Sequence, residues 1–321
     1  MTGAMKLRYV TFDVFTTERY AGNFLAIVIL NETQTLSQEQ KQIIAREFNY
    51  SETVILHGFE GISYTDKQRY KLDIFTTDQE LPFAGHPTIG TACFIAESSG
   101  QGLDSTKSTA FITKAGEIPF SYDKMSKIAK LDIPHDLHIH DKLITGIDLE
   151  QAGVIDSGSQ NVVGLVPFVS IVQGMTFAMV QLSTNDILSK ATRGLPEYGR
   201  FLDRPWHHDG ALVGAYYYVH NGKNADGTIL LRTRMLLGSL EDPATGSAAA
   251  GLSAFLARSE LNTSPSVGDV VSVRFEIEQG IDMGRKSTIY TEVSINKKTH
   301  QVQKITLGGS AVKVMEGYLS I

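Results

Sequence analysis

Two short segments of the chain carry residues that could bind an anion and move a proton on it. One segment contains Gly85-His86, and the other contains Asp242 and Gly246-Ser247. In both, the glycine precedes small residues with a helical apolar spacing, so each glycine is predicted to begin a helix. The start of a helix offers unpaired N–H groups and a positive dipole end, which suit a carboxylate or enolate oxygen. Histidine and aspartate transfer protons, so the pattern indicates acid–base chemistry on a small anion.

Each of these residues also has a purely structural explanation. His86, which precedes Pro87, could be no more than a helix-start residue, and Ser247 could be an N-terminal cap. Asp242-Pro243 initiates turns in many proteins. The residues occur together at matched positions of two similar segments, and this coincidence favours function over three separate structural explanations.

The two segments are predicted to be copies of one module. Residues 80–96 and 241–257 are identical at six of seventeen aligned positions, with a constant shift of 161 residues between Gly85 and Gly246. Two similar halves are therefore predicted. Their helix starts would face each other across a cleft that holds a small anionic molecule.

Most of the remaining chain is predicted to form strands around few helices. The first glycine-led helix extends to about Glu97, the second runs from about Ser247 to Arg258, and a capping box at Ser37 begins a further helix that reaches Asn49. Runs rich in β-branched or aromatic residues predict strands over 9–14, 26–30, 53–56, 70–75, 162–172, 177–182, 215–220, 270–277 and 290–295. An α+β fold is expected, with lobes over 1–132 and 133–310; the segment 311–321 is long enough to pair with either sheet.

The composition disfavours several classes of protein. The 321 residues carry a formal net charge of −6, so no basic field exists to attract nucleic acid. No apolar run approaches the roughly 18 residues that a membrane span needs. Because no apolar signal segment follows Met1, we expect a cytoplasmic location, with neither membrane nor nucleic acid as partner.

Cofactor and metal chemistry also lack motifs. Cys93 is the single cysteine, so no mechanism that needs two thiols is possible. The paired glycines lack the lysine of a phosphate loop, and neither a dinucleotide fingerprint nor a serine nucleophile elbow occurs. Two histidine clusters lack metal-motif spacing and are expected to be solvated loop residues, so we expect no metal and no cofactor. These clusters are His135, His138 and His140, and His207 and His208 beside Asp209.

Four motifs follow one another over nearly the whole chain. They are Asp13-Val-Phe-Thr16 with Gly22-Asn23 downstream, Ser51-Glu52-Thr53, Glu80-Leu-Pro-Phe-Ala-Gly-His-Pro-Thr88 and Glu241-Asp-Pro-Ala-Thr-Gly-Ser-Ala-Ala249. In this order they resemble the PhzF-like proteins of phenazine biosynthesis. The resemblance implies the diaminopimelate-epimerase fold, in which two pseudo-symmetric lobes each curl a mostly antiparallel sheet around a central helix. The 161-residue repeat agrees with this fold.

The resemblance also implies a reaction, the cofactor-free isomerisation of trans-2,3-dihydro-3-hydroxyanthranilate by a homodimer. Thiol-dependent members of the superfamily place a cysteine on each helix-start loop, whereas PhzF-like enzymes use a glutamate. The match places this glutamate at Glu52, with His86, Asp242 and Ser247 around the substrate. A carboxylate can act as base and then as acid if partial burial raises its pKa. Without the resemblance, Glu52 would be interpreted as an exposed carboxylate at a strand end.

We therefore expect an isomerase or epimerase that moves a proton on a small carboxylate-bearing substrate, with Glu52, His86 and Asp242 catalytic. The backbone at Gly85 and Gly246 and the hydroxyl of Ser247 would bind the substrate. One alternative is a non-catalytic protein that holds a small carboxylate at the two helix starts; another is a structural protein without a polar cleft. Departures from the family pattern, at Phe24, Thr77 and residues 235–237, bear on substrate identity more than on the fold.

Overall fold

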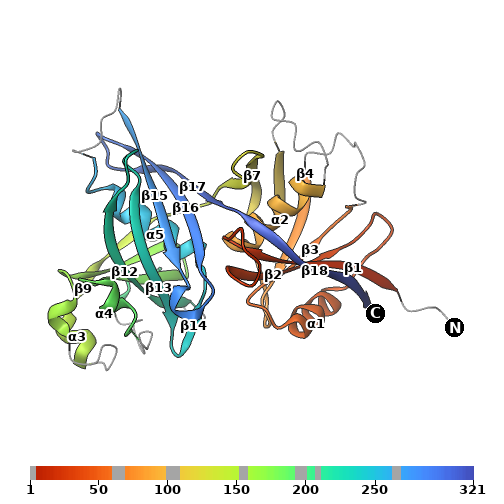
Figure 1. The fold of residues 1–321 in the computed structure, drawn as a ribbon, viewed down its shortest axis with the longest axis horizontal. Coiled ribbons are helices and arrows are strands. Elements are labelled where there is room, and N and C mark those ends of the chain that lie inside the picture. The colour runs from red at the N-terminus through yellow and green to blue at the C-terminus, as the bar shows by residue number, and fades with distance from the viewer. Residues whose placement is uncertain are drawn as a thin grey trace. The chain divides into compact units, whose positions relative to one another are not determined.

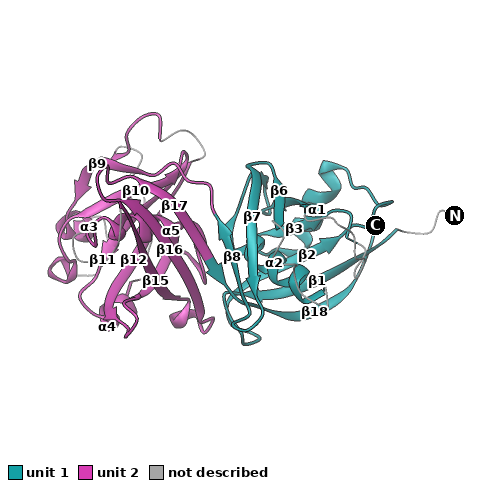
Figure 2. Cartoon of the chain, turned by 90° about the horizontal axis from the view of Figure 1, so that it is seen from above, with its two compact units in different colours: residues 1–132, 308–321 teal, residues 133–307 magenta. Residues whose placement is uncertain are grey.

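The structure is a computed structural model that describes residues 5–59, 69–98, 109–151, 158–191, 201–206, 211–261 and 269–321. The chain divides into two compact units, residues 1–132 with 308–321 and residues 133–307 (Figure 2). Strands dominate both units and helices are few (Figure 1), which confirms the predicted α+β class. Among the described residues, no helix has the length and apolar character needed to cross a membrane.

Unit 1 is built on a mostly antiparallel sheet. Its middle strands, β2 and β3, run parallel to each other, as do β4 and β6, and the other pairs are antiparallel. All four strands predicted in this unit are present. In spatial order the strands are β18 (Ala311–Ser320), β1 (Lys6–Val14), β2 (Asn23–Ile29), β3 (Thr53–Leu56), β4 (Arg69–Phe75), β6 (Thr109–Thr113), β7 (Gly116–Asp123) and β8 (Ile128–Asp132), with the short β5 (Glu80–Leu81) on β4.

Helix α2 (Gly85–Ser98) lies at the centre of unit 1. Every residue from His86 to Ala96 is buried, and strands β1, β2, β3, β7, β8 and β18 contact the helix (Figure 2). Gly90 makes this close packing possible, because a Cβ atom there would lie 2.4 Å from Leu25 Cδ2 and 2.7 Å from Val14 Cγ2. The helix that begins at the predicted glycine is therefore enclosed by the sheet rather than laid against it.

Helix α1 (Gln38–Phe48) has the ends that its sequence predicts. The Ser37 hydroxyl accepts a hydrogen bond from Gln40 N, and the Gln40 side chain accepts one from Ser37 N, which completes the capping box. The helix ends at Asn49, which adopts a left-handed conformation with φ of 54°. This turn directs the chain toward β3.

Unit 2 has the same kind of sheet around helix α5 (Gly246–Ala257). Parallel pairs again occur, between β11 and β12 and between β13 and β15, among antiparallel neighbours. Two short helices, α3 (Gly146–Gln151) and α4 (Asn185–Leu188), lie outside the sheet. The strands are β9 (His138–Ile144), β10 (Val166–Val172), β11 (Met175–Gln181), β12 (Leu212–Lys223), β13 (Ile229–Leu237), β14 (Leu240–Asp242), β15 (Val270–Gln279), β16 (Ser287–Asn296) and β17 (Val302–Gly309).

The 161-residue shift extends to the backbone pairing of the two units. Ile74 pairs with Leu81 between β4 and β5, and Met235 pairs with Asp242, 161 residues further along, between β13 and β14. Helices α2 and α5 begin at the two glycines that the repeat aligns. Each unit therefore has the same hairpin and helix at matching positions, which confirms the prediction of two similar halves.

Two sequence predictions in unit 2 need correction. The strand expected from Val162 begins at Val166, and Val162 itself forms only an isolated bridge to Leu182. His138 and His140 are not solvated loop residues, because they belong to β9, and His140 is 2% exposed. The polar run of these histidines and the following Asp141-Lys142 hid the strand, since the buried histidine is compensated by a hydrogen bond that the sequence does not show. The cluster at residues 207–209 lies outside the described residues.

Candidate active site

Glu52 lies at the junction between α1 and β3. Strand β3 starts at the next residue, Thr53, and is buried along its whole length between β2 and β4. The Glu52 side chain is 18% exposed, so Glu52 is not the exposed strand-end carboxylate of the structural explanation. Burial raises the pKa of Glu52 above its ordinary value, and a hydrogen bond with Ser51 partly opposes that effect.

His86 faces Glu52 from the first turn of α2. The imidazole Nδ1 lies 3.5 Å from Glu52 Oε2, and Nε2 lies 3.1 Å from the carbonyl oxygen of Phe24 on β2. A carbonyl oxygen only accepts hydrogen bonds, so Nε2 carries the hydrogen and Nδ1 of the neutral ring presents its lone pair. The Glu52 and His86 side chains can therefore share one proton between Oε2 and Nδ1.

The starts of β2, β3 and α2 thus converge on one point of unit 1. The structure brings Glu52 and His86 together there, with Gly85 beside His86 at the beginning of the helix. The neighbouring Thr53 has a buried hydroxyl with no hydrogen-bond partner among the described residues. A buried hydroxyl in this state can take up a water molecule or a ligand atom.

In unit 2 the structure places Asp242 next to the start of α5. The cap of this helix is Thr245, not Ser247, so the interpretation of Ser247 as a cap is wrong. Ser247 lies in the first turn, where it is half-buried. The Thr245 hydroxyl donates a hydrogen bond of 2.6 Å to Asp242 Oδ2, which holds the carboxylate against the loop that leads into the helix.

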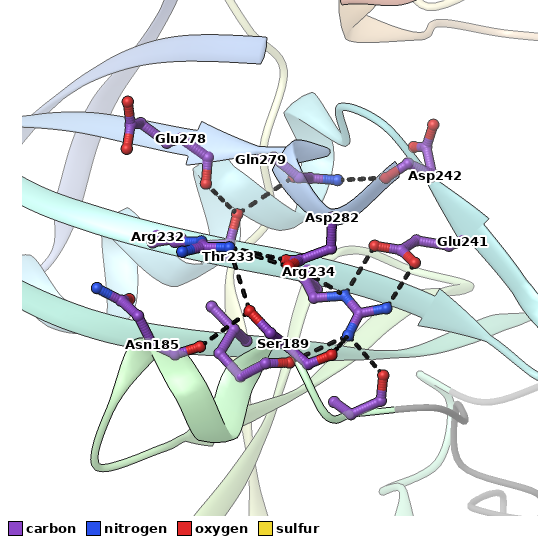
Figure 3. A network of polar contacts seen from close by, with 12 residues as sticks. Asn185, Ser189, Arg232, Thr233, Arg234, Glu241, Asp242, Glu278, Gln279 and Asp282 are labelled. Carbon is purple, nitrogen blue, oxygen red and sulfur yellow. Dashed lines mark hydrogen bonds and ion pairs between the residues drawn. The ribbon is translucent and has the colours of Figure 1, made fainter. Parts of the chain in front are cut away.

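Gln279 holds this loop through hydrogen bonds to Asp242 and Thr245. Its side chain is completely buried at the end of β15, and its Nε2 donates to Asp242 O at 2.8 Å (Figure 3). The same Nε2 donates to Thr245 Oγ1 at 3.0 Å. Its Oε1 accepts hydrogen bonds from the hydroxyl of Tyr216 at 2.9 Å and from Thr245 N at 3.3 Å. Sequence reasoning missed Gln279, because a lone glutamine at a strand end has no distinguishing pattern.

Arg234 binds Glu241, the residue before Asp242. The guanidinium group donates to both carboxylate oxygens of Glu241, at 2.8 and 2.7 Å, and to the carbonyl oxygens of Leu188, Ser189 and Ala191 (Figure 3). Arg234 is 8% exposed, so this bidentate pair is largely desolvated. It ties β14 to the end of α4 and thereby limits the movement of Asp242.

Cys93 does not contribute a reactive thiol. Its side chain is buried within α2, with Sγ 3.9 Å from Gly309 O, and burial raises the pKa of the thiol to about 12. A neutral buried thiol is a poor nucleophile and a poor base at neutral pH. The carboxylate and imidazole groups are therefore the acid–base candidates that the sequence predicted.

The model of the PhzC-PhzF family, described as phenazine biosynthesis-like protein, matches residues 12–317. The chain belongs to this family. An uncharacterized isomerase of Mesorhizobium japonicum is 30% identical to it over 98% of both chains. The trans-2,3-dihydro-3-hydroxyanthranilate isomerase of Pseudomonas aeruginosa is 27% identical, over 97% of this chain and 98% of the relative. The chain is accordingly an isomerase of the PhzC-PhzF family.

Solved structures support the same fold. The phenazine biosynthesis protein of the PhzF family from Bacillus anthracis has a TM-score of 0.74 at 19% identity, with 99% of this chain and 100% of that chain covered. A hydroxyproline epimerase from Agrobacterium vitis has a TM-score of 0.57 at 13% identity, with 98% and 93% covered. These likenesses confirm the predicted epimerase-like fold.

Proposed function

We propose that this PhzC-PhzF family member is a cofactor-independent isomerase or epimerase in which Glu52 acts as general acid and base on a small carboxylate-bearing substrate. The observation that carries the proposal is the approach of Glu52 Oε2 to His86 Nδ1 in a site where burial raises the pKa of the glutamate. Burial favours the neutral form of Glu52, which a group that returns a proton to the substrate requires.

The pair can serve both steps of a proton transfer between two carbon atoms. When the shared proton is on His86 Nδ1 and directed at Oε2, Glu52 is ionised, and its other oxygen, Oε1, can remove a proton from a substrate carbon. Protonated Glu52 can then return that proton to a second carbon of the conjugated system, while Nε2 remains hydrogen-bonded to Phe24 O. The separation of 3.5 Å is slightly longer than a hydrogen bond, as is common for catalytic pairs without substrate.

The residues around the start of α5 in unit 2 are also proposed to bind a small carboxylate-bearing molecule. The backbone N–H groups at Gly246 and Ser247 and the Ser247 hydroxyl would donate hydrogen bonds to the carboxylate or the developing enolate, since the first turn of a helix leaves such donors unpaired. Asp242, held by Thr245 and Gln279, would accept a hydrogen bond from an amino or hydroxyl group of the substrate. Gly85 would supply the equivalent donor at the start of α2.

The first substrate to test is trans-2,3-dihydro-3-hydroxyanthranilate, on which the Pseudomonas aeruginosa relative acts. A cyclic amino acid of this class has the carboxylate, the amine and the conjugated double bonds that the site can use. We also propose that the enzyme is cytoplasmic and that it is, as the resemblance implies, a homodimer. Light scattering of the purified protein would test the dimer.

The experiment is to incubate the wild-type protein with this compound and with related unsaturated amino acids in D₂O, and to follow each C–H position by NMR. We expect deuterium at one carbon and a shifted double bond or inverted centre. A protein that binds one of these acids, shown by calorimetry, but exchanges none of its C–H bonds would be the carboxylate-binding protein of the alternative hypothesis.

A further inference from the structure

Three potential metal ligands come together at β9 in unit 2. His138 and His140 lie two residues apart on the strand and so point to the same face of the sheet. Asp203 lies in the described segment 201–206 and reaches both rings. Its Oδ2 is 2.9 Å from His138 Nε2 and 3.3 Å from His140 Nδ1, and one ligand atom from each residue lies within 4.8 Å of the others.

The hydrogen bonds of His140 determine which of its nitrogens can bind a metal. Asp203 N donates to His140 Nδ1 at 2.9 Å, so Nδ1 is an acceptor and Nε2 carries the hydrogen. This Nε2–H donates to Ser170 Oγ, which in turn lies 2.6 Å from Thr176 Oγ1. A metal-binding histidine commonly has such a partner on its second nitrogen, which fixes the ring and the tautomer.

The arrangement leaves two electron-rich atoms facing each other. Nδ1 of neutral His140 and the Asp203 carboxylate oxygen are 3.3 Å apart, and the proton that offsets their repulsion is the one His138 Nε2 directs to Asp203. A cation at this position would contact all three atoms at once and would replace the single proton.

We propose that His138 Nε2, His140 Nδ1 and Asp203 Oδ2 form a site for one zinc-class divalent ion, with water as the remaining ligand. Ligand atoms around a tetrahedral zinc ion are separated by about 3.3 Å, given metal–nitrogen distances of about 2.0 to 2.1 Å. The observed separations of 2.9 and 3.3 Å from Asp203 Oδ2 are close to this value. Binding displaces the proton on His138 Nε2 and exchanges the N–H···Nδ1 hydrogen bond of Asp203 for a metal bond.

The surroundings provide both access and support. The His138 and Asp203 side chains are 30% and 29% exposed, whereas the His140 side chain is fully buried and forms the floor of the site. The indole of Trp206 stacks on His138, with ring centroids 4.6 Å apart and planes 4° apart. An aromatic face favours an imidazole that gains positive charge when it binds a metal. The ion would fasten the segment 201–206 to β9.

The test is metal binding by the full-length protein after removal of metals with a chelator. Co²⁺ is titrated and followed by its visible absorption, Zn²⁺ is titrated by calorimetry, and thermal midpoints are measured with and without Zn²⁺. We expect one equivalent of either ion, a tetrahedral Co²⁺ spectrum, and a raised midpoint, because the ion binds only the folded state. Failure of the wild-type protein to bind one equivalent would overturn the proposal.

Two variants locate the ion. His138→Gln and Asp203→Asn each remove one ligand and should weaken Zn²⁺ binding by more than about 100-fold, the upper range for loss of a supporting partner. The partly exposed His138 is the safer change for folding. His135→Ala, three residues before His138 and outside the cluster, should leave binding intact. Binding lost in His135→Ala, or retained in His138→Gln, would contradict the assignment.

Discussion

In the proposed reaction, the single carboxyl group of Glu52 acts as both acid and base. Its position at the start of a buried strand raises its pKa, and His86 offers a lone pair because the other ring nitrogen is committed to Phe24 O. Only one proton fits between the two groups without placing like charges or two hydrogens against each other. The chemistry of the site therefore depends on a carbonyl oxygen of β2 that no motif indicates.

The raised pKa predicts a pH-dependent effect of Glu52→Gln on stability. Below the unfolded-state pKa, about 4.3, the glutamate is neutral in both states and the variant should match the wild type. As the pH rises, the unfolded chain releases this proton more readily than the folded chain, so the wild type loses stability until the pH passes the folded-state pKa. Glutamine avoids that loss, so the variant should have the higher thermal midpoint at neutral pH.

Midpoints measured from pH 4 to pH 8 check this prediction. Glu47→Gln, which changes an exposed glutamate on α1, is the matched control and should not show the same trend. A difference between Glu52→Gln and the wild type that stays constant over the whole range, or that favours the wild type at neutral pH, would contradict a raised pKa.

At this scale the sequence could predict that Glu52 and His86 lie together, but not the residues that hold them. The Ser-Glu-Thr and Gly-His-Pro motifs pointed to Glu52 and His86, and the structure places these side chains together. The contacts of Phe24 O and Gln279 depend on tertiary packing between segments distant in sequence, so no local pattern could reveal them.

At the scale of elements, each unit contains a hairpin whose short second strand carries a largely buried glutamate. Glu80 on β5 pairs with Phe75 on β4 and interacts with Lys114 and Gln38, whereas Glu241 on β14, 161 residues later, is held by Arg234. Both glutamates form an ion pair, and this shared contact accounts for their identity in the repeat. In unit 2 the pair also restrains Asp242, which follows Glu241 directly.

Arg234→Met should destabilise unit 2 by about 3–5 kcal/mol, because the change leaves the Glu241 carboxylate, 16% exposed, without its cation. Denaturant unfolding would measure the loss. In the folded variant, a looser Asp242 should also raise KM for substrate more than it lowers kcat.

The double variant Arg234→Met/Glu241→Met provides the control. Replacing both charges with apolar side chains of similar length removes the unpaired carboxylate, so stability should recover in part. If the two side chains were not coupled, Glu241→Met would lower the stability of the Arg234→Met variant as much as it lowers that of the wild type. That result would contradict the coupling that the hydrogen bonds imply.

Periodicity predicted the elements with strong local signals and missed those shaped by packing. Strand 53–56 and the helix that begins after Ser37 match the structure closely because alternation and capping are local. Strand β9 reads as His-Ile-His-Asp-Lys-Leu-Ile, and its polar positions concealed it, although His140 is buried against Ser170. The short β5 and β14 were missed because two or three residues carry no period.

At the scale of the whole molecule, the end of the chain returns to the unit where it began. Strand β18 pairs with β1 from Lys6 opposite Ser320 to Val14 opposite Ala311, and residues 308–321 belong to unit 1. Of the β18 side chains only Ala311 is buried, so the strand contributes mainly through its backbone.

Deletion of residues 311–321 should destabilise unit 1 by about 5 kcal/mol or more, if each interstrand hydrogen bond contributes about 1 kcal/mol. Strand β1 would become an unpaired edge and a site for aggregation. Thermal unfolding and light scattering would measure both effects. Tyr318→Thr, which keeps the backbone pairing and changes a side chain that is 69% exposed, should alter the midpoint little. Equal effects of the two changes would contradict a backbone role.

The most direct test of the account is the rate at which deuterium from D₂O enters a bound substrate in the wild-type protein and in Glu52→Gln. The account predicts exchange at a single carbon in the wild type and a loss of at least about 10³-fold in the variant, the scale of a removed general acid–base group, with substrate affinity retained. Exchange by Glu52→Gln at the wild-type rate would contradict the assignment of Glu52 as the proton-transferring residue.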